Sequence, residues 1–265
     1  MPIAALREGA VNYVSQGFGP VVLLIHGFPL DHTMWREQIE ELSTTFRVIA
    51  VDLPGFGKSF VPVGDLTIER LADWIAEFLD VTGIQEPVTV GGLSMGGCVA
   101  LQFALRFPSR LSRLILCDCR AMADSTEVQK TRHETADRAL REGPGFLAEA
   151  MPARLFAART RESQPTVVKN TQDVIRQTAP EGAAGGSRAL ANRADVRGRL
   201  NEIRCPTLLI VGAEDMISTV DEMRTMAEAL SAGTLVEIPG AGHMAPLEVP
   251  EIVNAAIQNW LAASH

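Results

Sequence analysis

The sequence of 265 residues has no apolar run of the roughly 18 residues that a membrane-spanning helix needs. Its beginning, residues 1–8, lacks the basic stretch followed by an apolar core that is typical of a secretory signal. Positive charge is not in excess either: the net charge is −8. An acidic chain disfavours nucleic acid or an anionic membrane as a general partner, so neither is expected.

Cysteine is scarce, and the four residues lie mostly inside apolar runs: Cys98, Cys117, Cys119 and Cys205. No second pair of cysteines or histidines accompanies Cys117 and Cys119 at the spacing of a metal site. We therefore expect buried free thiols rather than disulfides or metal ligands. Free thiols fit a reducing compartment, and the predicted location is cytoplasmic.

What the sequence does contain is an alternation of short apolar runs with helical patterns. A chain of 265 residues can form one large domain, or a domain that carries an insertion. Near-continuous apolar strands separated by helices indicate a parallel sheet covered on both faces. The strand-like runs are 21–25, 47–51, 87–91, 111–117, 205–212 and 234–238. Helices are predicted over 68–81, with Gly83 just beyond the end, and over 252–261.

The pattern changes between residues 120 and 200, where no strand-like run occurs. This stretch predicts several helices, the first opened by Asp124 and Glu127 as a capping box. Glycine and proline predict interruptions at 143–145, at 165 and at 180–186. We expect an α/β core formed by residues 1–119 and 201–265. Residues 120–200 are expected to be a helical cap, inserted after the run 111–117, which we take as the sixth strand.

The most informative motif is Gly92-Leu93-Ser94-Met95-Gly96, placed between an apolar run and a helical one. The pattern G-x-S-x-G at a strand-to-helix junction is typical of a nucleophile elbow. Its serine is expected to have strained backbone geometry, and a side chain in place of either glycine would collide with a neighbouring strand or helix. Ser94 is the predicted nucleophile.

A serine hydroxyl needs a base to take its proton, and the base needs an acid to orient it. Of the five histidines, His243 alone combines a glycine-rich loop, the end of a predicted strand and a late position in the chain. Two acids are candidates, because Asp215 and Asp118 each follow a strand. The chain order serine, aspartate, histidine favours Asp215.

These motifs, together with His26-Gly27-Phe28-Pro29 and the segment 52–59, resemble the α/β-hydrolase fold family. The resemblance is strongest to the capped branch of 3-oxoadipate enol-lactonases, small carboxylesterases and cofactor-free haloperoxidases. It implies a mostly parallel eight-stranded sheet flanked by helices, with the cap after strand 6. It also implies Ser94 as nucleophile, His243 as base and Asp215 as acid, and an oxyanion hole formed by the N–H groups of Phe28 and Met95.

The resulting hypothesis is a serine hydrolase that cleaves esters or lactones through an acyl-enzyme, with no metal and no cofactor. A perhydrolase or haloperoxidase-like activity, carbon–carbon bond hydrolysis and a ligand receptor without turnover remain alternatives, and the oligomeric state stays open. A substrate carboxylate would need a cation. The candidates are Arg120 and the cap arginines Arg132, Arg138, Arg141, Arg154, Arg159 and Arg161.

Overall fold

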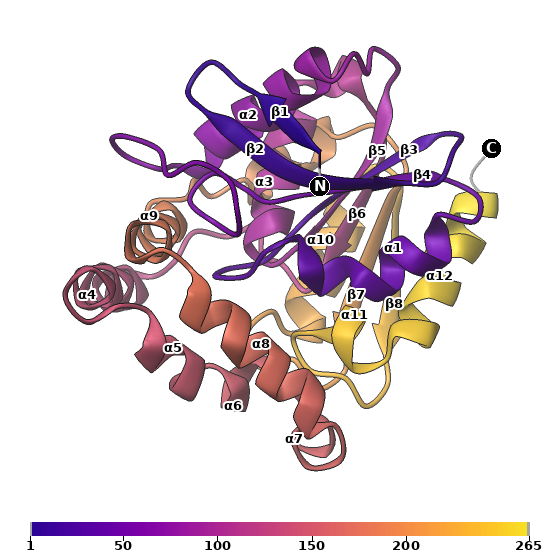
Figure 1. Cartoon of the computed structure of the whole chain (residues 1–265). Helices are drawn as coiled ribbons and strands as arrows, with labels where there is room; N and C mark the ends of the chain where they lie inside the picture. Colours follow the sequence, from indigo (N-terminus) through magenta and orange to yellow (C-terminus); the bar gives the residue numbers. More distant parts are fainter. Residues whose placement is uncertain (1, 264–265) are drawn as a thin grey trace.

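A computed structural model of the chain describes residues 2–263, and its strands form one eight-stranded sheet (Figure 1). The order across the sheet is β1-β2-β4-β3-β5-β6-β7-β8. From β3 to β8 the neighbouring strands are parallel, whereas β2 is antiparallel to both β1 and β4. The bounds are β1 (Ile3–Ala5), β2 (Ala10–Gln16), β3 (Val21–Ile25), β4 (Arg47–Val51), β5 (Val88–Leu93), β6 (Leu111–Cys117), β7 (Thr207–Gly212) and β8 (Gly233–Ile238). The predicted fold class is confirmed.

Helices cover both faces of the sheet, as the near-continuous apolar strands require. Leu23 and Ile25 of β3 pack with one set of helices, while Val22 and Leu24 face the other set. On the first face lie α2 (Ile68–Val81), α3 (Met95–Arg106) and α10 (Val220–Ala229). On the second lie α1 (Arg36–Leu42) and α12 (Pro250–Ala263). None of the helices described between residues 2 and 263 combines the length and apolar character that a bilayer crossing requires.

The sequence of helix α2 explains where the helix begins, which face it buries and where it ends. Its N-cap residue is Thr67, whose hydroxyl accepts a hydrogen bond from the Arg70 N–H. The apolar residues at helical spacing are buried against the sheet, and Leu71 and Leu79 are fully covered. Gly83 lies just past the end with φ +72°, a left-handed conformation that glycine adopts without steric cost.

Between β6 and β7 the chain forms helices with no strand among them, gathered at one end of the molecule (Figure 1). They are α4 (Thr126–Glu142), α5 (Gly145–Ala150), α6 (Pro152–Leu155), α7 (Ala158–Ser163), α8 (Pro165–Gln177) and α9 (Pro180–Ala191). The 3-10 helix η3 (Arg197–Glu202) follows them and packs against α10. The Thr178 hydroxyl donates to the Pro29 carbonyl beyond β3, and Gly182 packs on Gly55 beyond β4. These contacts place the helices over loops that follow the carboxyl ends of the strands. The division into core and cap domains stays a prediction.

The predicted capping box of Asp124 and Glu127 is wrong. The N-cap residue of α4 is Ser125, which accepts from the Val128 N–H. Asp124 instead accepts from two arginines, with one carboxylate oxygen 2.5 Å from Nε of the half-buried Arg132 and the other 2.8 Å from Nη2 of the buried Arg193. A buried carboxylate needs such partners, and this need overrides the local capping preference.

The predicted interruption over residues 180–186 is confirmed only at its start, where α8 ends at Gln177 and Pro180 begins α9. The glycines lie inside α9, so the rest of this prediction is wrong. A Cβ at Gly182 would stand 1.6 Å from the Gly55 carbonyl oxygen, and one at Gly186 would stand 2.7 Å from the Phe56 ring. These glycines allow close approach of α9 to the core loops rather than breaking the helix.

Candidate active site

Ser94 occupies the sharp turn between β5 and α3. Leu93 ends the strand and Met95 begins the helix, which leaves Ser94 at φ 55° and ψ −111°. A Cβ on Gly92 would lie 2.2 Å from the Gly96 carbonyl oxygen, and one on Gly96 would lie 2.2 Å from that of Ile25 in β3. The turn therefore requires glycine at both positions, as the motif predicts. The Ser94 side chain itself is only partly buried.

Two backbone N–H groups near Ser94 are the predicted oxyanion donors. Met95 is the first residue of α3, so its N–H has no acceptor within the helix. Phe28 lies in the loop after β3, and no group of residues 2–263 accepts its N–H or that of Met95. The loop comes close to Ser94, because a Cβ on Gly27 would stand 3.5 Å from the Ser94 Cβ.

His26 holds this loop in place and is fully buried. Its Nδ1 lies 2.9 Å from the Gly27 carbonyl oxygen, and its Nε2 lies 3.0 Å from the Leu53 nitrogen. A carbonyl can only accept and an N–H can only donate, so Nδ1 carries the proton and Nε2 accepts. Burial lowers the pKa of His26, which favours this neutral form.

Asp215 and His243 meet beyond the carboxyl ends of β7 and β8, at the same edge of the sheet as Ser94. Asp215 follows β7 and His243 follows β8, and both side chains are almost completely buried. His243 Nδ1 lies 2.8 Å from Asp215 Oδ2, while Oδ1 accepts from the Ile217 N–H at 2.7 Å. An ionised carboxylate only accepts, so Nδ1 donates and Nε2 is left as the basic nitrogen.

Asp118, the other candidate acid, is fully buried with a positive φ of 45°. Its Oδ1 accepts from the Gly212 N–H at 2.8 Å, and the structure gives its Oδ2 no hydrogen-bond partner among the described residues. Burial and the neighbouring charge of Asp215 raise the pKa of Asp118 well above its usual range, which favours a neutral carboxyl. Of the two acids, Asp215 is the one bonded to His243.

The ends of four neighbouring strands bring these segments to one edge. Leu93 of β5 pairs with Cys117 of β6, and Gly212 of β7 pairs with Ile238 of β8. Backbone hydrogen bonds continue beyond the strand ends, from Ser94 to Cys117 and from Glu214 to Ala241. The carboxyl edge of a parallel sheet is where ligands bind in open α/β folds.

One residue of this region, Glu248, is absent from the sequence-based candidates. It is buried at the end of the short helix α11 (Ala245–Glu248), and its carboxylate accepts from the N–H groups of Gly242 and Met244. One feature of the sequence could have indicated it: Glu248 is the single acidic residue in the otherwise apolar stretch from Met244 to Val249.

Three of the candidate arginines are committed to other contacts. Arg120 pairs with Glu222, and Arg132 pairs with Asp124. Arg138 pairs with Glu142 and lies over the Phe146 ring. Arg141, Arg154, Arg159 and Arg161 are exposed.

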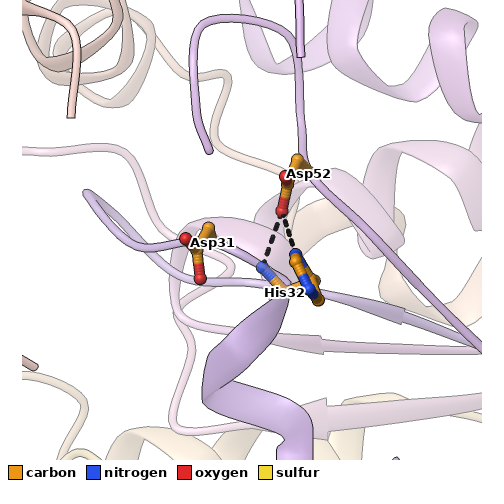
Figure 2. Close-up of side chains that lie close together, drawn as sticks. All are labelled: Asp31, His32 and Asp52. Carbon is orange, nitrogen blue, oxygen red and sulfur yellow. Dashed lines mark hydrogen bonds and ion pairs between the residues drawn. The ribbon is translucent and has the colours of Figure 1, made fainter. Parts of the chain in front are cut away.

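Asp31, His32 and Asp52 form a compact cluster where the loop after β3 ends and the loop after β4 begins (Figure 2). Asp52 Oδ1 accepts from the N–H and Nδ1 of His32 at 2.9 and 2.6 Å, and Oδ2 accepts from Asn12 and Lys58. Each oxygen of Asp52 thus already has two donors, so Asp52 is the centre of an internal network that joins four segments. Asp31 lies beside this network and accepts from Thr33 instead. Burial opposes ionisation of Asp52, but the hydrogen bonds outweigh it and lower its pKa to about 2.

Cys98, Cys117 and Cys119 are buried free thiols, as predicted, whereas Cys205 is free but only half-buried. Burial raises the pKa of Cys117 and Cys119 well above the usual range of a thiol. Both therefore remain protonated and unreactive at neutral pH.

Comparison with known proteins supplies the family. The profile of the alpha/beta hydrolase fold matches residues 20–250, and the chain belongs to this family of enzymes. A curated relative, 3-oxoadipate enol-lactonase 2 of Acinetobacter baylyi, is 30% identical over 254 residues, which cover 95% of this chain and 93% of the relative.

Solved structures agree with the predicted branch. A thermophilic esterase from Thermogutta terrifontis, solved with malate bound, is 42% identical with a TM-score of 0.96, and the match covers 100% of this chain and 98% of that one. An enol-lactonase from Burkholderia xenovorans is 32% identical with a TM-score of 0.92, over 98% of this chain and 100% of that one. A bromoperoxidase from Bacillus anthracis, 23% identical with a TM-score of 0.87 over 98% and 99% of the two chains, shares the fold.

Proposed function

We propose that the protein is a serine hydrolase that cleaves carboxylic esters or lactones through an acyl-enzyme. Ser94 is the nucleophile, His243 the general base and Asp215 the acid that orients it. The observation that carries the proposal is the buried 2.8 Å hydrogen bond between Asp215 and His243, at the sheet edge where Ser94 stands in a strained turn. A base oriented by a carboxylate, at the same sheet edge as an elbow serine, supports nucleophilic acyl transfer, which needs such a base to act on the serine hydroxyl.

In the first half-reaction, His243 Nε2 takes the proton of the Ser94 hydroxyl while Oγ attacks the carbonyl carbon of the substrate. The tetrahedral intermediate collapses, the C–O bond to the leaving alcohol breaks, and the alkoxide receives the proton from Nε2. In the second, His243 deprotonates a water molecule that attacks the acyl-enzyme, and the carboxylic acid leaves as Ser94 regains its proton. With a lactone, the alcohol stays attached to the acyl chain.

Negative charge develops on the carbonyl oxygen in both steps, and the N–H groups of Phe28 and Met95 would stabilise it. Neither N–H is used within residues 2–263, so both can donate to a substrate. Each such donor contributes about 3–4 kcal/mol of transition-state stabilisation. Met95 adds the positive end of the α3 dipole, since it is the first residue of a 12-residue helix.

The choice of esters and lactones is supported by the relatives. The Thermogutta terrifontis protein is named an esterase, and the Acinetobacter baylyi and Burkholderia xenovorans proteins are named enol-lactonases. Both substrate types present a carbonyl carbon bonded to an ester oxygen, and the same triad serves both. Short acyl esters and small lactones are therefore the first substrates to test.

The test combines labelling and turnover. A fluorophosphonate should label Ser94 of the wild-type protein and fail to label Ser94→Ala. The wild type should hydrolyse p-nitrophenyl esters or a lactone at a steady rate, and Ser94→Ala and His243→Ala should lose nearly all of this activity. One burst of product equal to the enzyme concentration, with no steady state, would instead indicate a receptor that captures ligand without turnover.

A further inference from the structure

Building on the proposed function, we propose that Glu248 is a positioning residue for His243, and that it ties the backbone around this base to the helical segment 155–164. No step of the proposed reaction uses Glu248. Glu248 is nonetheless buried, with 2% of its surface exposed. It ends the one-turn helix α11, which begins two residues after His243.

One carboxylate oxygen holds the backbone on both sides of His243. Oε1 of Glu248 accepts from the Gly242 N–H at 2.8 Å and from the Met244 N–H at 3.2 Å. The hydrogen bond to Asp215 restrains the imidazole at Nδ1, but the ring can still shift with its own Cα. Restraining both flanking peptides restrains that Cα, and with it the direction in which Nε2 points.

The second oxygen holds the helical segment. Oε2 accepts from the Ala157 N–H at 2.8 Å and from the Thr160 hydroxyl at 2.6 Å. The main-chain oxygen of Glu248 also accepts from Gln164 Nε2 at 3.0 Å. Glu248 thus receives three groups from residues 157–164 and two from the His243 loop.

Direct packing reinforces this link. A Cβ on Gly242 would stand 2.7 Å from the Ala157 nitrogen and 3.2 Å from the Leu155 carbonyl oxygen. The residue before His243 therefore lies against the segment between α6 and α7 with no room for a side chain. A displacement of that segment would reach the base through Gly242 and Glu248 together.

The hydrogen-bond pattern requires an ionised carboxylate. Four donors point at the two oxygens of Glu248, and a carboxylate offers about four lone-pair positions, all as acceptors. A protonated carboxyl would turn one of these into an O–H facing a donor. Burial raises the pKa of Glu248, and the four hydrogen bonds oppose that rise. Burying an ionised carboxylate costs desolvation free energy, and such a group is expected where two segments must be held in a fixed relative position.

Glu248→Gln tests the proposal, because an amide has one accepting oxygen and one NH₂ donor. In either orientation, the NH₂ faces two donors that have lost their acceptor. We expect kcat for an ester to fall about 10–100-fold with KM little changed, since a small misplacement of a catalytic group costs on this scale. Amide hydrogen exchange should accelerate in both 240–244 and 155–164. The matched control is Glu251→Gln, an exposed glutamate three residues on, which should leave both measurements unchanged.

Rates are compared well below the melting temperature, per mole of folded protein. A Glu248→Gln variant with a lower melting temperature but wild-type kcat would overturn the proposal, because a merely structural residue would behave in that way. If this variant does not fold, Thr160→Val replaces it, since it removes one donor to Oε2 without changing the side-chain volume much. Thr160→Val should lower kcat by no more than about 10-fold, since one of the four hydrogen bonds is lost, and accelerate exchange in 240–244. Unchanged exchange there would overturn the link.

The two proposals fail differently. If the wild-type protein hydrolyses no ester or lactone, the proposed function fails. The exchange measurement would still show whether Glu248 joins the two segments.

Discussion

His243 donates from Nδ1 to Oδ2 of Asp215 across 2.8 Å, and this contact determines which nitrogen of the ring is free. The carboxylate is itself held by the Ile217 N–H at 2.7 Å, so it cannot rotate without losing a second hydrogen bond. The basic lone pair of the imidazole is therefore on Nε2. The reaction rate depends on the orientation and tautomer of the base as well as on its chemical nature.

Asp215→Asn should lower kcat for ester hydrolysis by about 10⁴-fold, because an amide can leave the imidazole in the wrong tautomer. The fold should be retained, since asparagine has nearly the same shape and can still accept from Ile217. Steady-state kinetics together with circular dichroism of the purified variant measure both effects.

Asp118→Asn is the matched comparison and should lower kcat by less than about 10-fold. Burial and the charge of Asp215 raise the pKa of Asp118 well above its usual range, which favours a neutral carboxyl, and asparagine resembles that form closely. The amide oxygen can still accept from the Gly212 N–H. A severe loss in Asp118→Asn with a mild loss in Asp215→Asn would show that Asp118 is the catalytic acid.

Asp52→Asn should destabilise the fold in a pH-dependent way. Asp52 has a pKa of about 2 in place of 3.8, so its contribution is lost as pH falls through this range. Burial lowers the pKa of His32, but its hydrogen bond to Asp52 and the charge of Asp52 outweigh this and raise it. The His32 contribution is therefore complete below 6.5 and lost as pH rises through the folded-state value.

The difference between wild type and Asp52→Asn should therefore be largest at intermediate pH. We expect about 3–5 kcal/mol near pH 5 from urea unfolding, as for removal of one partner of a buried ion pair, and less near pH 3 and pH 8. The exposed Asp65→Asn should change stability by less than about 0.5 kcal/mol. An Asp52→Asn effect of equal size at all three pH values would contradict the ionised pair.

Two glycines of α9 should respond oppositely to alanine. Gly182→Ala places a methyl group 1.6 Å from the Gly55 carbonyl oxygen, so the helix must move, at a cost of about 1–3 kcal/mol. Gly185→Ala places one 3.4 Å from Leu66, close to ordinary contact, and alanine favours a helix. Thermal unfolding should show a lower melting temperature for Gly182→Ala only, and equal losses in both variants would contradict the close packing.

Local patterns predicted much of the fold. The strands 21–25, 47–51 and 111–117 and the helix 68–81 coincide with β3, β4, β6 and α2. The strands are largely apolar runs, and the helix has apolar residues at helical spacing. Each element is followed by a glycine or a polar residue, so each can be recognised from its own stretch of sequence. The N-terminal strands β1 and β2 carry no such signal, because β2 is half exposed and partly polar.

What the sequence could not reveal depends on partners distant along the chain. Asp124 has a capping pattern, but Arg132 and Arg193 decide its role in the folded protein. Gly182 is typical of an interruption, yet it lies inside α9 at a position where a Cβ would collide with Gly55. Glu248 has no motif of its own. Its role depends on four donors, two of which come from residues about ninety positions earlier.

The most direct measurement is rapid-quench mass spectrometry of the protein mixed with p-nitrophenyl acetate. We expect a transient acetyl adduct on the peptide that contains Ser94, formed and lost at rates that match steady-state turnover. Ser94→Ala should show no adduct, and Asp215→Asn should form it much more slowly. Turnover with no adduct at Ser94 would show that Ser94 is not the nucleophile, and an equal adduct rate in Asp215→Asn would show that Asp215 does not orient the base.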